Sequence, residues 1–270
     1  ETTSPATSNP ARDRSSQPFR SRRTTSLNVV WFKRDLRVAD HRPLAFAARH
    51  GAVLPLYIAE PGFWAEPDAS GRQWSFAAEC LAELQRDLAA LGQPLRVIAG
   101  DAVSVFRAIH EVHGIAAVWS HEETGNGWTY GRDRTVRAWA READVPWHEF
   151  RQFGVIRRLA SRDGWAAAWD RDMAEPLTPA PQQLQPIDGD WPTRIPAAEN
   201  LGLAPDPCFR RQRGGRRAAL SVLGSFLMER GRDYRFQMSS PLTAFRACSR
   251  LSPHLAWGTR SEEHTSELQS

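Results

Sequence analysis

The chain has 270 residues, of which 41% are hydrophobic and 24% charged, and its net charge is +4. These values fit a globular protein of about two domains, and the charge is too small to indicate nucleic-acid binding by itself. The three cysteines are scattered and form no metal-binding or disulfide pattern, which favours a reducing, cytoplasmic location. No apolar run approaches the roughly 20 residues that cross a bilayer, so we expect no membrane association.

The N-terminal segment 1–26 is rich in Ser, Thr, Pro and Arg and holds almost no apolar residues. Such a composition is typical of disorder. The chain starts at Glu1, and β-rich sequence begins abruptly at Leu27. We expect a disordered leader, either a native arm or upstream DNA translated in frame. Arginines far outnumber the single lysine, Lys33; we interpret this bias as coding-sequence composition and not as a binding signal.

From residue 27 onward, short β-rich runs alternate with helical segments. Strands are predicted at 27–32, 53–58, 95–99, 116–120 and 147–150. Between them, Leu81, Leu84 and Leu88 recur at helical spacing, Asp101 is a typical N-cap, and a further helix is predicted at 130–143. This alternation predicts an α/β fold, a Rossmann-like, doubly wound sheet of five parallel strands in the order 3-2-1-4-5.

Two polar loops follow the first and fourth predicted strands, namely 33–41 and 121–133. In the predicted strand order they face each other across a crevice, where open α/β sheets bind ligands. Two interpretations of the first loop stay open: a ligand site, or an ion-paired loop that orders the turn and docks a second domain, which its residue types favour. The second loop is either part of the ligand site or solvated. Its glycines do not form a dinucleotide-binding fingerprint, and the chain has no P-loop motif.

The C-terminal third changes character. Eight prolines between residues 174 and 213 break any regular element and predict an inter-domain connection. A helix is then predicted at 215–230. Ser252 and Pro253 predict another helix start with Ser252 as N-cap, whose free N–H groups attract an anion. Ser249 and Arg250 add a hydroxyl and a positive charge, although a Ser-Pro cap by itself is more often structural.

Three ordered motifs resemble the cryptochrome/photolyase family. They are WFKRDLRVADHRPL at 31–44, GGRRAALSVLGSFLMERGRDY at 214–234 and SRLSPHLAWGT at 249–259. The resemblance covers about residues 27–259. It implies an α/β antenna domain at 27–155, a connection at 156–213 and the start of a helical FAD-binding domain at 214–259.

The resemblance also implies cofactors and the residues that bind them. Tyr234 corresponds to the family's tyrosine near the flavin. The segment that grips the FAD phosphates corresponds to Ser249, Arg250, Leu251 and Ser252. Cys248 stands where the family often has Thr, and a thiol is a weak donor. His41 stands where Asn is common. The family can carry a second, antenna chromophore of folate or deazaflavin type, which the variable loop at Glu122 and Glu123 can approach.

In photolyases, excited reduced FAD passes an electron to a pyrimidine dimer in UV-damaged DNA, with the dimer flipped into a pocket. The resemblance therefore implies a carbon–carbon lyase that acts as a monomer. The alternatives are a cryptochrome, in which the scaffold signals light without repair, and a stand-alone nucleotide-binding α/β domain, against which the flavin-domain motifs argue. In the family, the electron-relay tryptophans and the DNA-binding groove lie after the last of these motifs in the sequence. We therefore expect no catalytic residue in this chain. We also expect no metal site.

The last eleven residues, RSEEHTSELQS at 260–270, read as the translation of a common sequencing adapter. We therefore expect the native part of this chain to end near residue 259, so that the chain is cut inside the FAD-binding domain. An incomplete flavin cavity predicts that this chain is inactive and retains little FAD. It also predicts exposed apolar side chains, such as Leu220, Leu223 and Phe226, that favour aggregation.

Overall fold

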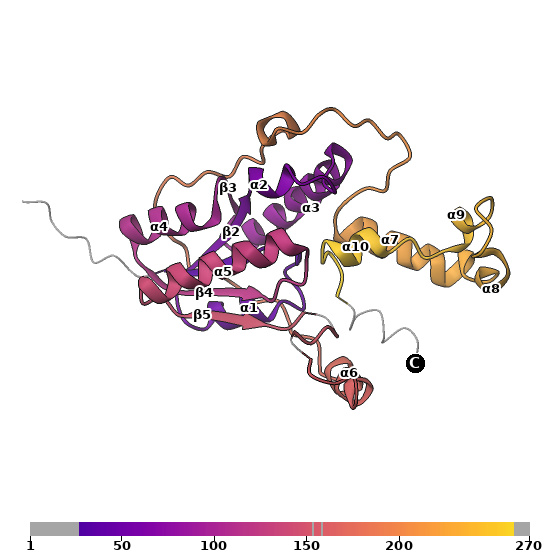
Figure 1. Cartoon of the computed structure of the whole chain (residues 1–270), viewed down its shortest axis with the longest axis horizontal. Coiled ribbons are helices and arrows are strands. Elements are labelled where there is room, and N and C mark those ends of the chain that lie inside the picture. The colour runs from indigo at the N-terminus through magenta and orange to yellow at the C-terminus, as the bar shows by residue number, and fades with distance from the viewer. Residues whose placement is uncertain (1–26, 153, 158, 262–270) are drawn as a thin grey trace, which may run out of the picture.

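The computed structural model describes residues 27–152, 154–157 and 159–261. Its first part is a parallel sheet of five strands in the order β3-β2-β1-β4-β5, which confirms the predicted fold class and strand order (Figure 1). The strands are β1 (Leu27–Phe32), β2 (Val53–Ala59), β3 (Arg96–Ala99), β4 (Ile115–His121) and β5 (Trp147–Phe150). Each lies within two residues of the predicted bounds.

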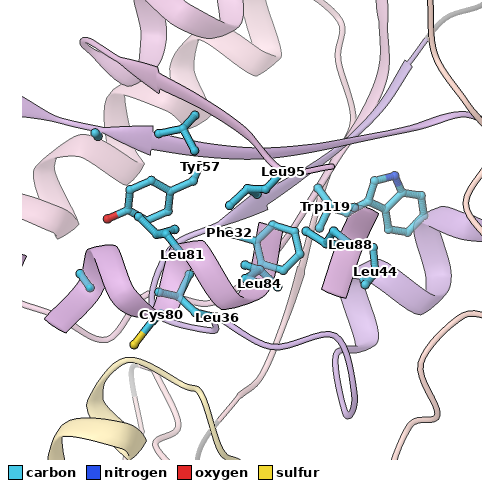
Figure 2. Packing of buried hydrophobic residues seen from close by; sticks show 14 of the residues in the cluster. Phe32, Leu36, Leu44, Tyr57, Cys80, Leu81, Leu84, Leu88, Leu95 and Trp119 are labelled. Carbon is cyan, nitrogen blue, oxygen red and sulfur yellow. The ribbon is translucent and has the colours of Figure 1, made fainter. Parts of the chain in front are cut away.

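The sheet is covered on both faces because its central strand is apolar on both. In β1, Val30 and Phe32 belong to one buried cluster, whereas Val29 and Trp31 belong to another. The first cluster packs against α1 (Arg42–Ala48) and α3 (Gly71–Ala90), and Figure 2 shows Leu81, Leu84 and Leu88 of α3 beside Phe32. The second packs against α4 (Ala102–His113) and α5 (Gly127–Glu142). A short helix, α2 (Pro61–Trp64), follows β2.

Side-chain caps set where these helices begin. Asp101 accepts a hydrogen bond from the Ser104 backbone N–H at 2.9 Å, which confirms the predicted cap of α4. Asn126 accepts one from the Thr129 N–H at 3.1 Å and starts α5 at Gly127. The predicted start at residue 130 was three residues late because the apolar periodicity begins only after this polar cap.

The Pro-rich connection contains one regular element, a 3-10 turn (Ala198–Leu201), between the described residues 174 and 215. Helix α6 (Trp165–Met173) precedes it and was not predicted. The connection lies along the first domain (Figure 1): the Leu184 N–H donates to the Leu91 carbonyl at 2.7 Å, and the Val97 N–H donates to the Pro192 carbonyl at 3.0 Å. It therefore pairs with the open edge of β3, which would otherwise be free to pair with another chain.

The C-terminal elements are short helices that extend away from the sheet (Figure 1). They are α7 (Arg216–Ser225), a π-helical turn (Phe226–Arg230), α8 (Tyr234–Gln237), α9 (Ala244–Ala247) and α10 (Ser252–Ala256). The prediction of a helix at about 215–230 is therefore confirmed in extent, although its last turn is π-helical. The winding widens where the Gly231 N–H bonds back to the Phe226 carbonyl.

Leu220 is exposed as expected, but the expectation for Leu223 was wrong, because this residue is 5% exposed.

The predicted Ser252 cap is also wrong. Leu251 precedes α10 as its cap, already in helical conformation (φ −82°, ψ −15°), and makes no side-chain cap bond. The chain turns one residue earlier, at Arg250, whose φ is +61°. Ser252 therefore lies inside the first turn.

The expectations for residues 1–26 and 262–270 concern residues outside the described part of the chain. Of the segment 260–270, the structure describes only Arg260 and Ser261, and both are buried. Among the described residues, no helix combines the length and the apolar character needed to cross a membrane.

Candidate functional site

The two predicted polar loops meet at the carboxyl ends of β1 and β4, which confirms that they face one crevice. The Arg34 guanidinium lies 3.2 Å from a Glu123 carboxylate oxygen. A cavity of about 410 Å³ opens beside them, and its walls include Phe63, Trp64 and Trp257. Its volume falls in the range of small-molecule sites, on the order of 300–1,000 Å³.

Asp35 organises the floor of the crevice. One carboxylate oxygen accepts the Lys33 backbone N–H at 2.7 Å. The other accepts His41 Nε2–H at 2.9 Å and His121 Nδ1–H at 2.7 Å. Burial opposes the charge on Asp35, but the two histidines outweigh it and hold the pKa of this carboxyl well below its usual range. Asp35 is thus a buried anion whose two oxygens are both satisfied.

The two histidines are neutral and each carries its proton on a defined nitrogen. His41 Nδ1 accepts the Leu44 N–H at 3.1 Å and caps α1, so its proton sits on Nε2. Burial lowers the pKa of His41, and burial together with His41 lowers the pKa of His121 to about 3. The ligand-type atoms of Asp35 and the two histidines lie within 4.8 Å of one another. Because both imidazoles donate to the carboxylate, this cluster is complete as a hydrogen-bond network without a metal.

Two buried polar atoms at the crevice are not satisfied. Burial lowers the pKa of Lys33, and Asp133 partly offsets this from 3.7 Å. Its Nζ lies 4.8 Å from the centre of the Trp31 ring and has no hydrogen-bond acceptor. Burial raises the pKa of Glu60 to about 7 although Arg132 donates to it at 2.6 Å, and the second carboxylate oxygen of Glu60 has no partner.

The first loop also docks the C-terminal segment. Arg37 Nη1 donates to the Gly258 carbonyl at 2.9 Å, and the Leu36 N–H donates to the Trp257 carbonyl at 3.1 Å. Trp257 stacks on Trp64 with a centroid distance of 5.9 Å and an interplanar angle of 6°. The interpretation of the loop as a docking element is therefore confirmed. The loop also lines the crevice, and its role as a ligand site stays a prediction.

A second cavity, of about 690 Å³, lies between α7 and the segment 245–250. Four arginines line it, namely Arg213, Arg230, Arg246 and Arg250, together with Ser221 and Ser225. No carboxylate lines it, and among the described residues none of the four forms an ion pair. Arginine side chains that form no ion pair, with the Ser221 hydroxyl beside them, are suited to bind a phosphate group. We call this the arginine cavity.

The structure brings only some of the predicted site residues together. Arg250 lines the arginine cavity. Ser249 and Leu251 flank it in the chain, and the Ser249 carbonyl accepts a hydrogen bond from Arg230. Tyr234 lies instead against Phe226, with their ring centres 5.9 Å apart, and does not line the cavity.

Sequence reasoning missed Arg213, Arg230 and Arg246 as site residues. The arginine excess was interpreted as composition, and these residues are spread over more than thirty positions with no motif spacing. Their only sequence signal is their place in the motif-bearing segment 213–250.

The fold and the two cavities define a class, a doubly wound α/β unit joined to a helical unit. Residues 28–157 match the DNA photolyase family model. The chain is 29% identical to a deoxyribodipyrimidine photo-lyase of Halobacterium salinarum over 86% of the chain and 52% of that protein. It is 28% identical to a cryptochrome DASH of Gloeobacter violaceus over 90% of the chain and 53% of that protein.

A solved bacterial class III photolyase from Agrobacterium tumefaciens superposes with a TM-score of 0.75 at 24% identity, over 94% of this chain and 55% of that one. These sequence matches all lie in the cryptochrome/photolyase family, and the superposition supports its fold. The chain spans about half the length of the curated relatives it matches.

Proposed function

We propose that the chain is part of an FAD-dependent, blue-light-driven DNA photolyase, and that its arginine cavity binds the diphosphate of FAD. The observation that carries this proposal is the group of four arginines without a carboxylate in the segment that bears the family's flavin motif. A diphosphate supplies the negative charge that this group lacks.

The roles of the chain's own residues follow from where they lie. Arg250, Arg213 and Arg246 are the charged groups for the phosphates, and Ser249, Leu251 and Ser252 supply the neighbouring turn. Tyr234, on α8, is proposed to face the flavin region, away from the phosphates. When bound and reduced, FAD supplies the electron for splitting a pyrimidine dimer.

Titration of the purified chain with FAD, followed by flavin fluorescence, tests the cofactor assignment. We expect Arg250→Gln to weaken binding by about tenfold to a hundredfold, since a charge-assisted hydrogen bond is worth about 1.5–3 kcal/mol. Arg210→Gln is the matched control, because Arg210 is an exposed arginine outside the cavity. Equal FAD affinities of the two variants would show that Arg250 does not bind the phosphates.

Repair activity separates the two family functions. We expect the complete protein encoded at this locus to restore a dimer-containing oligonucleotide under blue light, with UV-damaged DNA as its substrate. If it holds photoreducible FAD but repairs neither cyclobutane nor 6-4 dimers, it is a cryptochrome photoreceptor. Its cytoplasmic location and monomeric state stay predictions.

We further propose that residues 27–155 form an antenna domain whose crevice holds a second chromophore, with residues 156–213 as the connection and 214–259 as the entry to the FAD domain. The crevice offers aromatic walls for a planar ring, and Lys33 Nζ and Glu60 Oε1, which lack hydrogen-bond partners, offer polar contacts. Extraction of the holoprotein, followed by absorption spectra, distinguishes a folate from a deazaflavin. An extract that contains FAD alone would contradict the antenna assignment.

A further inference from the structure

The turn at residues 248–250 is held in place by a side chain from the π-helical turn. Arg230 donates through Nε to the Ser225 hydroxyl at 3.0 Å and through Nη2 to the Val222 carbonyl at 2.8 Å. The same guanidinium bonds the carbonyl of Cys248 through Nη1 and that of Ser249, at 3.3 Å, through Nη2. Arg230 therefore ties the end of α7 to two successive carbonyls of the turn, and each of its three nitrogens is engaged.

A second side chain holds the next carbonyl. Gln212 Nε2 donates to the Arg250 carbonyl at 2.9 Å. Arg250 has a φ of +61°, in the left-handed region that residues with a Cβ avoid. Such a conformation persists only where the surrounding structure enforces it, and Gln212 is the contact that fixes this peptide group.

These contacts orient the backbone around Arg250. With a left-handed residue followed by the helical Leu251, successive N–H groups form a concave anion-binding arrangement. Within the described part of the chain, the N–H groups of Arg250, Leu251 and Ser252 have no acceptor. The three carbonyls of residues 248–250 are all occupied by Arg230 and Gln212.

We propose that Arg230 and Gln212 are positioning residues that set the phosphate-binding turn before FAD arrives. The proposal rests on the proposed function for the identity of the ligand, but the preset turn is a property of the ligand-free chain. Arg230 acts through its forked geometry, because its donors are spent on protein oxygens. Its charge alone, which a lysine would retain, does not substitute for that geometry.

The test compares Arg230→Lys and Gln212→Glu with the control Arg210→Lys, which changes an exposed arginine outside the cavity. Gln212→Glu keeps the side-chain length but removes the Nε2 donor. Amide NMR spectra of the ligand-free chain report the turn through the signals of residues 249–252 and the HN–Hα coupling of Arg250. Titrations with FAD and with riboflavin, which lacks phosphate, report whether the turn contributes to binding the phosphates.

We expect the two turn variants, but not the control, to shift these amide signals and lose the left-handed coupling. Their affinity for FAD falls by on the order of tenfold, as for one lost hydrogen bond to a charged group, while their affinity for riboflavin is unchanged. An unaltered turn in both variants would overturn the proposal, whether or not FAD binds. If the turn collapses in the variants but the unchanged chain has no affinity for FAD, the positioning role stands and the proposed diphosphate role of the arginine cavity is refuted.

Discussion

The crevice of the α/β unit and the arginine cavity of the helical unit differ in whether their charged side chains are paired within the protein. In the crevice, Asp35 is a buried anion whose oxygens accept three N–H groups, and Arg34 and Arg132 are paired with carboxylates. In the arginine cavity, four cationic side chains line the wall with no carboxylate among them. The charges of the first region are balanced within the protein, whereas the second region has no carboxylate of its own to balance its arginines.

The largest expected effect comes from removing the charge at the centre of the first region. Asp35→Asn places an amide between two imidazole N–H donors, and we expect it to reduce the free energy of unfolding by about 3 kcal/mol, as when one member of a buried pair is removed. Urea unfolding followed by tryptophan fluorescence measures this. Asp163→Asn, at an exposed aspartate, is the control. A loss below about 1 kcal/mol for Asp35→Asn, typical of surface changes, would mean that the network contributes little.

The junction between the two regions comes next. A Cβ on Gly258 would lie 2.5 Å from Asp35 Cα and also overlap the Arg34 carbonyl, and φ at Gly258 is +59°. We expect Gly258→Ala to reduce the free energy of unfolding by about 2–3 kcal/mol, through strain at positive φ and displacement of the docked segment.

Gly202→Ala is the matched control for this junction. Gly202 has a φ of +75°, and a Cβ added there would meet nothing within 4 Å, so only the conformational cost of about 1 kcal/mol remains. Equal losses of unfolding free energy in the two variants would show that docking at Gly258 does not contribute to stability. The Trp64–Trp257 contact provides a fluorescence signal for the displacement.

The histidines of the crevice give a pH dependence. Burial and His41 hold the pKa of His121 near 3, whereas an unfolded histidine titrates near 6.5. The unfolded chain therefore binds more protons below pH 6.5, and stability falls as the pH drops from there toward 3. For this group alone, we expect a loss of about 2 kcal/mol between pH 7 and pH 5.

His121→Asn removes that titration while an amide nitrogen still donates to Asp35. We expect the difference in stability between the wild type and this variant to shrink or reverse as the pH falls from 7 to 5, measured by urea unfolding at each pH. Parallel stability curves would contradict the neutral state of His121 in the folded chain.

The smallest effect on stability belongs to the arginine cavity. Arg246→Gln removes an exposed charge that has no carboxylate partner among the described residues, so we expect the free energy of unfolding to change by less than about 0.5 kcal/mol. Its FAD affinity should nevertheless fall, which a fluorescence titration measures. A large stability loss with unchanged FAD affinity would make this arginine structural and remove the contrast between the two regions.

The first domain was predictable because its signals are local. Alternating β-rich and helical runs, Asp101 as a cap and the polar ends of β1 and β4 are all visible in short windows of sequence. Strand order then follows from the rules of parallel α/β sheets. The C-terminal unit was less predictable: the helix at 215–230 ends in a π-helical turn, and α10 starts without a Ser252 cap.

What the sequence by itself determined is the α/β class, the strand order and the family motifs, since each depends on neighbours in the chain. Only the tertiary structure decided which polar groups meet. Asp35 and His121 are 86 positions apart yet 2.7 Å from each other, and Arg213 and Arg250 line one cavity from opposite ends of the helical unit. The physical reason is that burial and the turn at Arg250 bring distant side chains together, and no local pattern in the chain encodes that proximity.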